Sequence, residues 1–192
     1  RAGWAQVEVG GAPGMAGAED AGASGAELRA ILGGSGASEG KMEGGARRVG
    51  GNVSVRREGT TELGTRCEVK NINSLRSMGR AIEYEARRQV DLIESGETVE
   101  QQTRHWNEDD GCTHKLRSKE EAYDYRYFPE PDLVPVEPSD EWIAEIRATL
   151  PMLPRDRRRR LADVAAVEPS DTALTVERGM DDLAVDTIAA GA

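Results

Sequence analysis

Residues 48–74 read RVGGNVSVRREGTTELGTRCEVKNINS, and this stretch decides the fold. It contains two runs in which apolar and polar residues alternate, at positions 52–56 and 66–70. Strict alternation is typical of a strand that buries one face and exposes the other. The turn-forming residues Glu58-Gly59-Thr60-Thr61 lie between the two runs, so the stretch predicts an antiparallel hairpin.

The two faces of this hairpin differ in chemistry. Alternation points one set of residues into a core: Val53, Val55, Cys67 and Val69. The opposite face carries charges and amides at close range: Asn52, Ser54, Arg56, Arg66, Glu68 and Lys70. A solvated sheet surface accounts for such a face, and the alternative is the floor of a cleft that holds a metal ion and a phosphate.

Length and composition narrow the class of protein. A chain of 192 residues is expected to form one or two domains. It begins at Arg1 without a signal peptide or presequence, so we expect a piece of a longer chain. Nothing approaches the roughly 20 apolar residues of a membrane helix. The sequence therefore predicts a soluble protein with no membrane partner.

The cysteines and histidines predict neither a secreted protein nor a zinc site. Cys67 and Cys112 are far apart and lack a CxxC partner, which favours a reducing cytoplasm over secretion. His105 and His114 do not fall in a metal-ligand spacing.

The charge balance limits contact with nucleic acid. A net charge of −10 and a pI of about 4.8 argue against broad, nonspecific binding, which needs a positive footprint. The obvious basic cluster is RDRRRR, residues 155–160. A solvated helix face is the more common explanation of such a run, and local RNA binding is the alternative.

The first 51 residues have an unusual composition, since they hold 15 of the 22 glycines. Composition alone predicts a flexible linker. Two islands nevertheless look organised: residues 4–9 (WAQVEV) predict a strand, and residues 26–32 (AELRAIL) predict a helix.

A long amphipathic helix follows the hairpin. Ser74 or Asn73 can cap its start, and Gly96 lies where a glycine commonly ends a helix. Apolar residues recur at three- and four-residue steps along it: Leu75, Met78, Ile82, Ala86, Val90 and Ile93.

Further strands and a group of helices complete the chain. Residues 98–106 and 113–117 predict a second hairpin, and the aromatic run 123–128 predicts another strand. That strand either packs in the core with an exposed ion pair or delivers Asp124 and Arg126 to a polar site. After Pro138 the pattern is all-helical, with expected helices at 139–150, 155–164 and 170–188.

Four runs together resemble one family. They are residues 64–74 (GTRCEVKNINS), 80–85 (RAIEYE), 117–122 (RSKEEA) and 125–132 (YRYFPEPD). These runs closely resemble GatB, the B subunit of the tRNA-dependent amidotransferase, which makes Gln-tRNA or Asn-tRNA from misacylated Glu-tRNA or Asp-tRNA. Four long runs in order are far more specific than one short motif.

The resemblance implies an α+β fold. The expected architecture is an antiparallel sheet cradle flanked by helices, similar to the core of glutamine synthetase. Residues 1–138 would form part of this catalytic cradle, and residues 139–192 would begin an all-α domain. The tRNA-binding tail that follows in the family is expected to be absent.

The resemblance also implies an activity. The cradle would use ATP and Mg²⁺ to phosphorylate the side-chain carboxylate of Glu-tRNA(Gln) or Asp-tRNA(Asn). Ammonia released from glutamine by the A subunit would then displace the phosphate. The implied assembly is a cytoplasmic heterotrimer, in which the amidase (A) subunit and a small C subunit join this chain, with misacylated tRNA as the substrate.

The resemblance and the polar hairpin face together suggest site residues. Glu68 and Glu8 are candidate Mg²⁺ ligands, since this ion prefers hard oxygen atoms. Catalysis is expected to involve Glu68, Lys70 and Arg66, with charge neutralisation as the main contribution of the cations. The candidate cofactor-binding residues are Arg48, Asn71, Asn73 and Arg126.

The match fails in the glycine-rich region. Val49-Gly50 stand where the family has a Cys-Asp pair, and that aspartate would share a face with Asn52 and Ser54. The family's upstream Glu-x-His metal motif is also missing. We therefore expect the isolated chain to be inactive, and a catalytically silent module that docks other subunits or presents tRNA is the alternative function.

Overall fold

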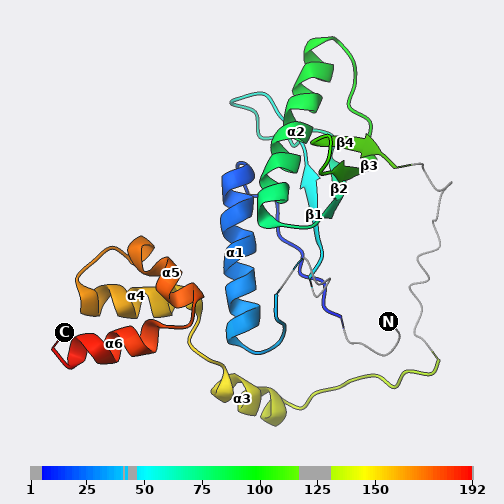
Figure 1. The fold of residues 1–192 in the computed structure, drawn as a ribbon. Coiled ribbons are helices and arrows are strands. Elements are labelled where there is room, and N and C mark those ends of the chain that lie inside the picture. The colour runs from blue at the N-terminus through cyan, green and yellow to red at the C-terminus, as the bar shows by residue number, and fades with distance from the viewer. Residues whose placement is uncertain (1–5, 41, 43–46, 117–130, 192) are drawn as a thin grey trace.

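The computed structural model describes residues 6–40, 42, 47–116 and 131–191. Figure 1 shows a sheet with helix α2 (Leu75–Glu94) against it, helix α1 (Ala18–Gly34) beside α2, and a group of helices farther along the chain. No helix in these described ranges is both long enough and apolar enough to cross a membrane. The strand expected at 123–128 lies outside the described residues.

The sheet has four strands in the order β1-β2-β3-β4. They are β1 (Val49–Val53), β2 (Cys67–Ile72), β3 (Gln102–Asn107) and β4 (Cys112–Lys115). The pairing of the two predicted hairpins is confirmed, because β1 pairs with β2 and β3 pairs with β4, both antiparallel. The bounds of the first strand were wrong, since β1 ends at Val53 and residues 54–56 of the predicted run 52–56 lie outside it.

The prediction of an antiparallel sheet is wrong for the central pair. Strands β2 and β3 run parallel, so the sheet is mixed. Helix α2 lies between them in sequence, and it carries the chain from the end of β2 back to the side of the sheet at which β2 begins. The fold class is therefore α+β with a mixed sheet.

A bulge at Asn71 keeps the inner face of β2 apolar. Val49 pairs with Ile72 while Gly51 pairs with Val69, so β2 has one residue more than β1 between these pairs. Asn71 lies at the bulge and has a φ of 65°, a left-handed conformation that asparagine tolerates. As a result Ile72 is buried together with Val69.

The two ends of α2 form as the sequence predicts. The Ser74 hydroxyl accepts a hydrogen bond from the Ser77 N–H at 2.9 Å, which caps the first turn. Gly96 has a φ of 83°, and the Glu97 N–H donates to the Leu92 carbonyl at 2.8 Å. This left-handed glycine closes the helix with a Schellman motif.

The buried face of α2 differs from the predicted apolar stripe. Val90 and Ile93 are 40% and 42% exposed, so the distal part of the stripe does not reach the core. Ala81, Glu85 and Gln89 are fully buried instead. The prediction missed Glu85 and Gln89 because it counted only apolar residues, whereas these two polar side chains find hydrogen-bond partners inside the protein.

Helix α1 packs on α2 through a glycine. A Cβ atom on Gly25 would lie 2.7 Å from Leu75 Cδ2 and 3.1 Å from Met78 Cε, so a larger residue would require the ends of these two side chains to shift. Arg47 Nη1 also donates to the Gly25 carbonyl at 2.8 Å. The glycine-rich segment 18–34 is therefore a packed helix, longer than predicted, and the linker interpretation is wrong for it.

The predicted strand at residues 4–9 does not form over its described part. Residues 6–9 have no regular secondary structure, and Val7 and Val9 are 88% and 62% exposed. The described core between α2 and the sheet takes its apolar residues from elsewhere: Ala21, Met42, Val53, Val69, Ile72, Met78, Ala81 and Trp106.

A buried carboxylate lies between α2 and the sheet. Glu85 on α2 is fully buried and accepts hydrogen bonds from Arg88 at 2.6 Å, Gln89 at 2.9 Å and Thr113 at 2.8 Å. The guanidinium of Arg104 on β3 lies 3.3 Å from the same carboxylate. Glu85 thus joins α2 to both β3 and β4.

The network around Glu85 also reaches the first two strands. Gln89 Nε2 donates to the Val53 carbonyl of β1 at 3.1 Å. Arg88 Nη2 lies 3.5 Å from the Cys67 Sγ atom of β2. Every strand of the described sheet therefore makes a polar contact with this part of α2.

The environment of Glu85 keeps it ionised. Burial raises its pKa, but the hydrogen bonds from Arg88, Gln89 and Thr113 outweigh burial and hold the pKa below the ordinary value of 4.5. The bond to Glu85 raises the pKa of Arg88, whereas burial and the Arg88 charge lower the pKa of Arg104. Arg88 is therefore the main counter-ion of the buried carboxylate.

The all-helical character of the last part of the chain is confirmed, but the single helix expected at 170–188 is wrong, because a 3₁₀ helix and two α-helices lie there. Its elements are α3 (Asp140–Thr149), α4 (Pro154–Ala165), the 3₁₀ helix η1 (Pro169–Thr172), α5 (Ala173–Glu177) and α6 (Asp181–Ala189). Ser139 caps α3, accepting a hydrogen bond from the Trp142 N–H at 3.2 Å. The domain boundary near residue 138 stays a prediction.

Much of the arginine run is used inside the protein. Asp181 on α6 is fully buried and bonds to both Arg157 and Arg160 of α4. Arg158 pairs with Glu27 of α1 at 2.8 Å. These arginines join helices to one another, so the solvated-face interpretation is wrong for them.

Replacing Glu85 by Gln tests the buried network. The change would leave two arginines without their counter-ion inside the protein, which typically costs about 3–5 kcal/mol. We expect urea unfolding at pH 7 to show a loss of this size. The exposed Glu83→Gln on the same helix is the matched control and should change stability by less than about 0.5 kcal/mol.

The same prediction has a pH signature. The pKa of Glu85 is lower in the folded protein than its ordinary value of 4.5. Its contribution to stability is therefore fully present above pH 4.5 and is lost as the pH falls through the folded pKa. Wild-type stability should therefore fall with acidification below pH 4.5 more steeply than that of Glu85→Gln. Equal stability of the two proteins at pH 7 would contradict this account.

Candidate active site

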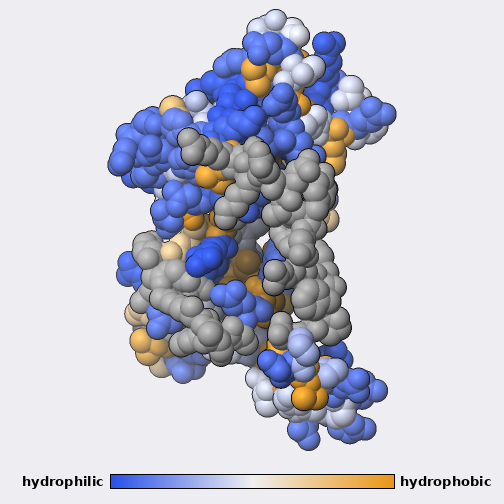
Figure 2. All heavy atoms as spheres, turned by 90° about the vertical axis from the view of Figure 1, so that its right-hand side faces the viewer, coloured by the Kyte–Doolittle hydropathy of each residue, from blue (hydrophilic) through white to orange (hydrophobic). Residues whose placement is uncertain are grey.

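The face of the sheet opposite α2 carries the polar residues that the sequence singled out. Arg104 and Trp106 of β3 point toward α2, so their neighbours along the strand point away from it. Glu68 lies opposite Asn52 on β1 and opposite Thr103 on β3, and this row crosses the open face. Figure 2, seen from the right-hand side of Figure 1, shows mainly hydrophilic residues over the upper part of the molecule, which α2 and the sheet form.

Glu68 and Lys70 lie side by side on this face. Their side chains are 41% and 54% exposed, and Lys70 Nζ lies 3.5 Å from Glu68 Oε2. The Thr103 hydroxyl donates to the same oxygen at 3.3 Å. The prediction that both residues point away from the core is confirmed, while Cys67 and Val69 point inward with no exposed surface.

Position 50 lies next to the Glu68 carboxylate. A Cβ atom on Gly50 would be 3.9 Å from Glu68 Oε1 and 3.5 Å from the Val69 carbonyl oxygen. A side chain at this position would therefore extend over the open face toward Glu68. An aspartate at position 50 would place a second carboxylate beside that of Glu68.

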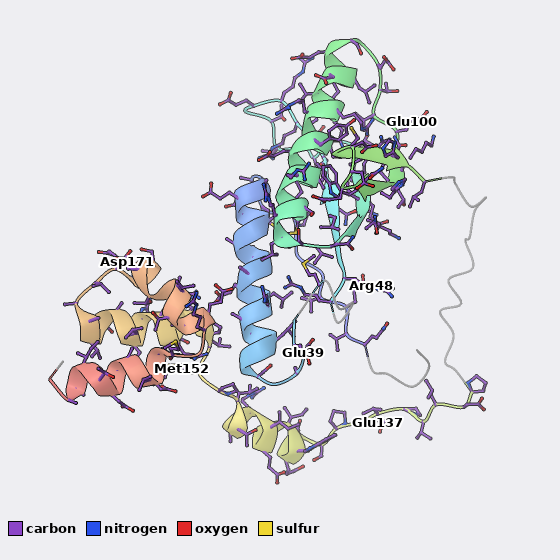
Figure 3. The ribbon with its side chains drawn as sticks, in the orientation of Figure 1. Glu39, Arg48, Glu100, Glu137, Met152 and Asp171 are labelled. Atoms are coloured by element: carbon purple, nitrogen blue, oxygen red, sulfur yellow. The ribbon has the colours of Figure 1, made fainter. Side chains whose placement is uncertain are left out.

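The other basic candidates lie at the margins of the open face. Figure 3 shows Arg48 where the chain enters β1, and Glu100 at the other end of the sheet. Arg48 is exposed, and so is Arg66, which immediately precedes β2. Asn73 is exposed between β2 and α2. Their roles in cofactor binding stay predictions.

Two candidates are placed differently from the others. Asn71 Nδ2 donates to the Trp106 carbonyl at 2.9 Å, so this amide group ties the bulged end of β2 to β3. Glu8 is exposed in a segment without regular structure. Arg126 lies outside the described residues.

The open face offers a limited set of metal ligands. Within the described ranges, no group of three or more histidine, cysteine, aspartate or glutamate residues could hold a metal ion. Glu68 supplies one carboxylate, with Lys70 close enough to neutralise a phosphate oxygen. Mg²⁺ commonly binds through one or two carboxylates, with substrate phosphates and water completing its shell. The residues therefore fit a magnesium ion that is held largely by a nucleotide.

Sequence reasoning missed residues that the structure brings to this region. Thr103 and His105 of β3 lie in register with Glu68 and Lys70. The alternation along β3 could have placed them on one face, but only the parallel pairing of β2 and β3 puts that face beside Glu68. The sequence also gave no signal that Glu85 would be buried, because charged residues of an amphipathic helix are expected on its exposed face.

Sequence comparison decides the family. The model of the family described as "GatB/GatE catalytic domain" matches residues 1–144. This chain belongs to the GatB family. The resemblance seen in the four sequence runs is thereby confirmed, whereas the likeness to glutamine synthetase stays a prediction.

Curated relatives of this GatB-family chain are named as the B subunit of an aspartyl/glutamyl-tRNA(Asn/Gln) amidotransferase. The protein from Leifsonia xyli subsp. xyli is 51% identical over 168 residues, which cover 86% of this chain and 33% of the relative. The Pelagibacter ubique protein is 44% identical over 176 residues, or 92% of this chain and 36% of the relative. The Rickettsia bellii protein is 54% identical over 154 residues, which cover 80% of this chain and 32% of the relative. This chain therefore spans about a third of the length of these relatives.

The exposed pair of Glu68 and Lys70 is expected to contribute little to stability. Exposed ion pairs typically contribute about 0–1 kcal/mol, because water screens both charges. We expect Glu68→Gln and Lys70→Met each to lower the free energy of unfolding in urea by less than about 1 kcal/mol. A loss as large as that predicted for Glu85→Gln would show that the pair maintains the fold, and would argue against a binding role.

Proposed function

We propose that this chain is part of a protein that uses ATP to activate the side-chain carboxylate of Glu-tRNA(Gln) or Asp-tRNA(Asn). The observation that carries the proposal is the Glu68–Lys70 pair, which is exposed beside Thr103 on the open face of the sheet. Family membership supports it, because the named relatives are components of a tRNA amidotransferase. The proposed assembly is a cytoplasmic heterotrimer with the A subunit and a small C subunit, built around a glutamine synthetase-like cradle.

The chemistry explains why such a site needs both signs of charge. A carboxylate is a poor electrophile, and phosphorylation supplies a good leaving group for later attack by ammonia. Bound ATP would supply the phosphoryl group, and bound Mg²⁺ would neutralise part of its charge. Glu68 would hold the metal ion, while Lys70 and Arg66 would orient the phosphate oxygens.

The remaining candidates would extend this site. Arg48 is exposed at the start of β1 and would contact phosphate, with Asn73 and the segment containing Arg126 as further polar contacts. Asn71 would act mainly by shaping β2, since its amide nitrogen is already bonded to Trp106. Glu8 would act as a second metal ligand.

A catalytically silent module is the second candidate function. Gly50 leaves Glu68 without a neighbouring acid, which weakens the case for an active metal site. Helix α3 and the residue after it expose an apolar face, since Trp142, Ile146 and Leu150 are 51%, 47% and 59% exposed, and another protein of the assembly could dock there. Such a module would bind its partner proteins or tRNA without binding Mg-ATP.

Nucleotide binding separates the two functions. Isothermal titration should detect Mg²⁺-dependent ATP binding by the chain, and Glu68→Gln should abolish it because the metal loses its carboxylate. Lys70→Met should weaken ATP binding even when Mg²⁺ is saturating, because a phosphate contact is lost.

A second exposed ion pair provides the matched control. Lys115 Nζ lies 3.5 Å from Glu100 Oε2, the same separation as in the Glu68–Lys70 pair. Glu100→Gln and Lys115→Gln should leave ATP binding unchanged. The absence of Mg-ATP binding, or its equal loss in the control variants, would favour the silent module.

Restoring an acid at position 50 should strengthen the site. Gly50→Asp would place a second carboxylate next to Glu68 Oε1, and two carboxylates bind Mg²⁺ more tightly than one. We expect the Mg²⁺ concentration needed for half-maximal ATP binding to fall several-fold. Gly50→Asn is the control, since it adds similar bulk without the charge; an equal gain with Asn would show that the charge is not responsible.

A further inference from the structure

The β3–β4 hairpin brings the only two histidines of the chain face to face. His105 on β3 pairs with His114 on β4, and their ring centroids lie 5.4 Å apart with an angle of 32° between the planes. Nine positions separate them in sequence, a spacing that gave no metal-site signal. The turn between β3 and β4 brings the two residues opposite each other in space although they are distant in sequence.

A carboxylate orients one of the two rings. His114 Nε2 lies 2.7 Å from Asp110 Oδ2. The Cys112 N–H donates to the other oxygen of Asp110 at 2.9 Å, so the turn itself fixes the carboxylate. When Nε2–H of His114 donates to Asp110, the Nδ1 atom keeps a free lone pair. Metal-binding histidines commonly have such a carboxylate on the second ring nitrogen.

The other ring has a nitrogen without a partner. His105 Nδ1 is buried, and nothing in the described part of the chain forms a hydrogen bond with it. A buried polar atom without a partner is unfavourable, and a ligand can relieve the penalty. Rotation of the ring by a half turn exchanges Nδ1 with Cδ2, which lets this nitrogen face a bound ion.

We propose that His105 and His114 form a binding site for a transition-metal cation of the Zn²⁺, Ni²⁺ or Cu²⁺ class. Imidazole nitrogen suits these ions, whereas Mg²⁺ prefers oxygen ligands. Asp110 is the positioning residue that orients His114. No third histidine, cysteine or acidic residue completes the cluster in the described chain, so water would fill the remaining coordination positions.

The proposed site is separate from the one that would hold Mg²⁺. His105 lies in register with Lys70, and His114 is one strand farther from Glu68. A cation on the two histidines would therefore add positive charge at the edge of the open face. Its binding does not depend on the proposed amidotransferase activity, and it can be tested in the absence of ATP.

Titration of the tag-free chain with Zn²⁺ and Ni²⁺ tests the proposal. Calorimetry should show one binding site for the transition-metal ion. An excess of Mg²⁺ should not weaken binding at this site. His105→Gln and His114→Gln should each abolish binding, and Asp110→Asn should weaken it by roughly 10–100-fold. Lys115→Gln, a neighbouring surface change on β4, should have no effect.

Electron paramagnetic resonance with Cu²⁺ adds a readout that is independent of affinity. Coupling to two imidazole nitrogens is expected for the wild type, and the signal should be lost in either histidine variant. Circular dichroism establishes that each variant is folded. Absence of binding by the wild type would overturn the proposal, as would binding that survives both histidine changes but is lost in Cys112→Ser.

Discussion

The buried carboxylate of Glu85 is the constraint on which the rest of the structure depends. It lies on α2 with no exposed surface, bonded to Arg88, Gln89 and Thr113 and close to Arg104. A buried charge is tolerated only when its partners are in place, so α2 can sit on the sheet in one orientation and one register. The polar network thereby fixes which side of every strand faces inward.

The functional face follows from that constraint. Once Arg104 and Thr113 are held against α2, alternation sends His105 and His114 to the opposite side, as it sends Glu68 away from the buried Cys67. The charged row of the open face is therefore a consequence of the buried network. Its exposed residues contribute little to stability and are free to bind ligands. GatB-family membership is consistent with this use of the face.

Local sequence patterns predicted much of the fold, and they also predicted which face of the sheet carries the candidate site residues. The two hairpins, the caps of α2 and the outward direction of Glu68 and Lys70 all depend on short-range periodicity and turn chemistry. The parallel pairing of β2 with β3 and the burial of Glu85 depend on contacts between distant residues, which a single sequence does not reveal. Likewise, the arginine run looked like a solvated face, because its partner Asp181 lies on another helix.

The most direct test of the central claim is a map of amide chemical shifts in the isotopically labelled chain as Mg-ATP is added. If the open face is the nucleotide site, the largest changes should occur at Glu68, Lys70 and Thr103, while amides beside the buried Glu85 stay nearly unchanged. Changes confined to the helical region, around Arg157 and Arg160, would contradict the account.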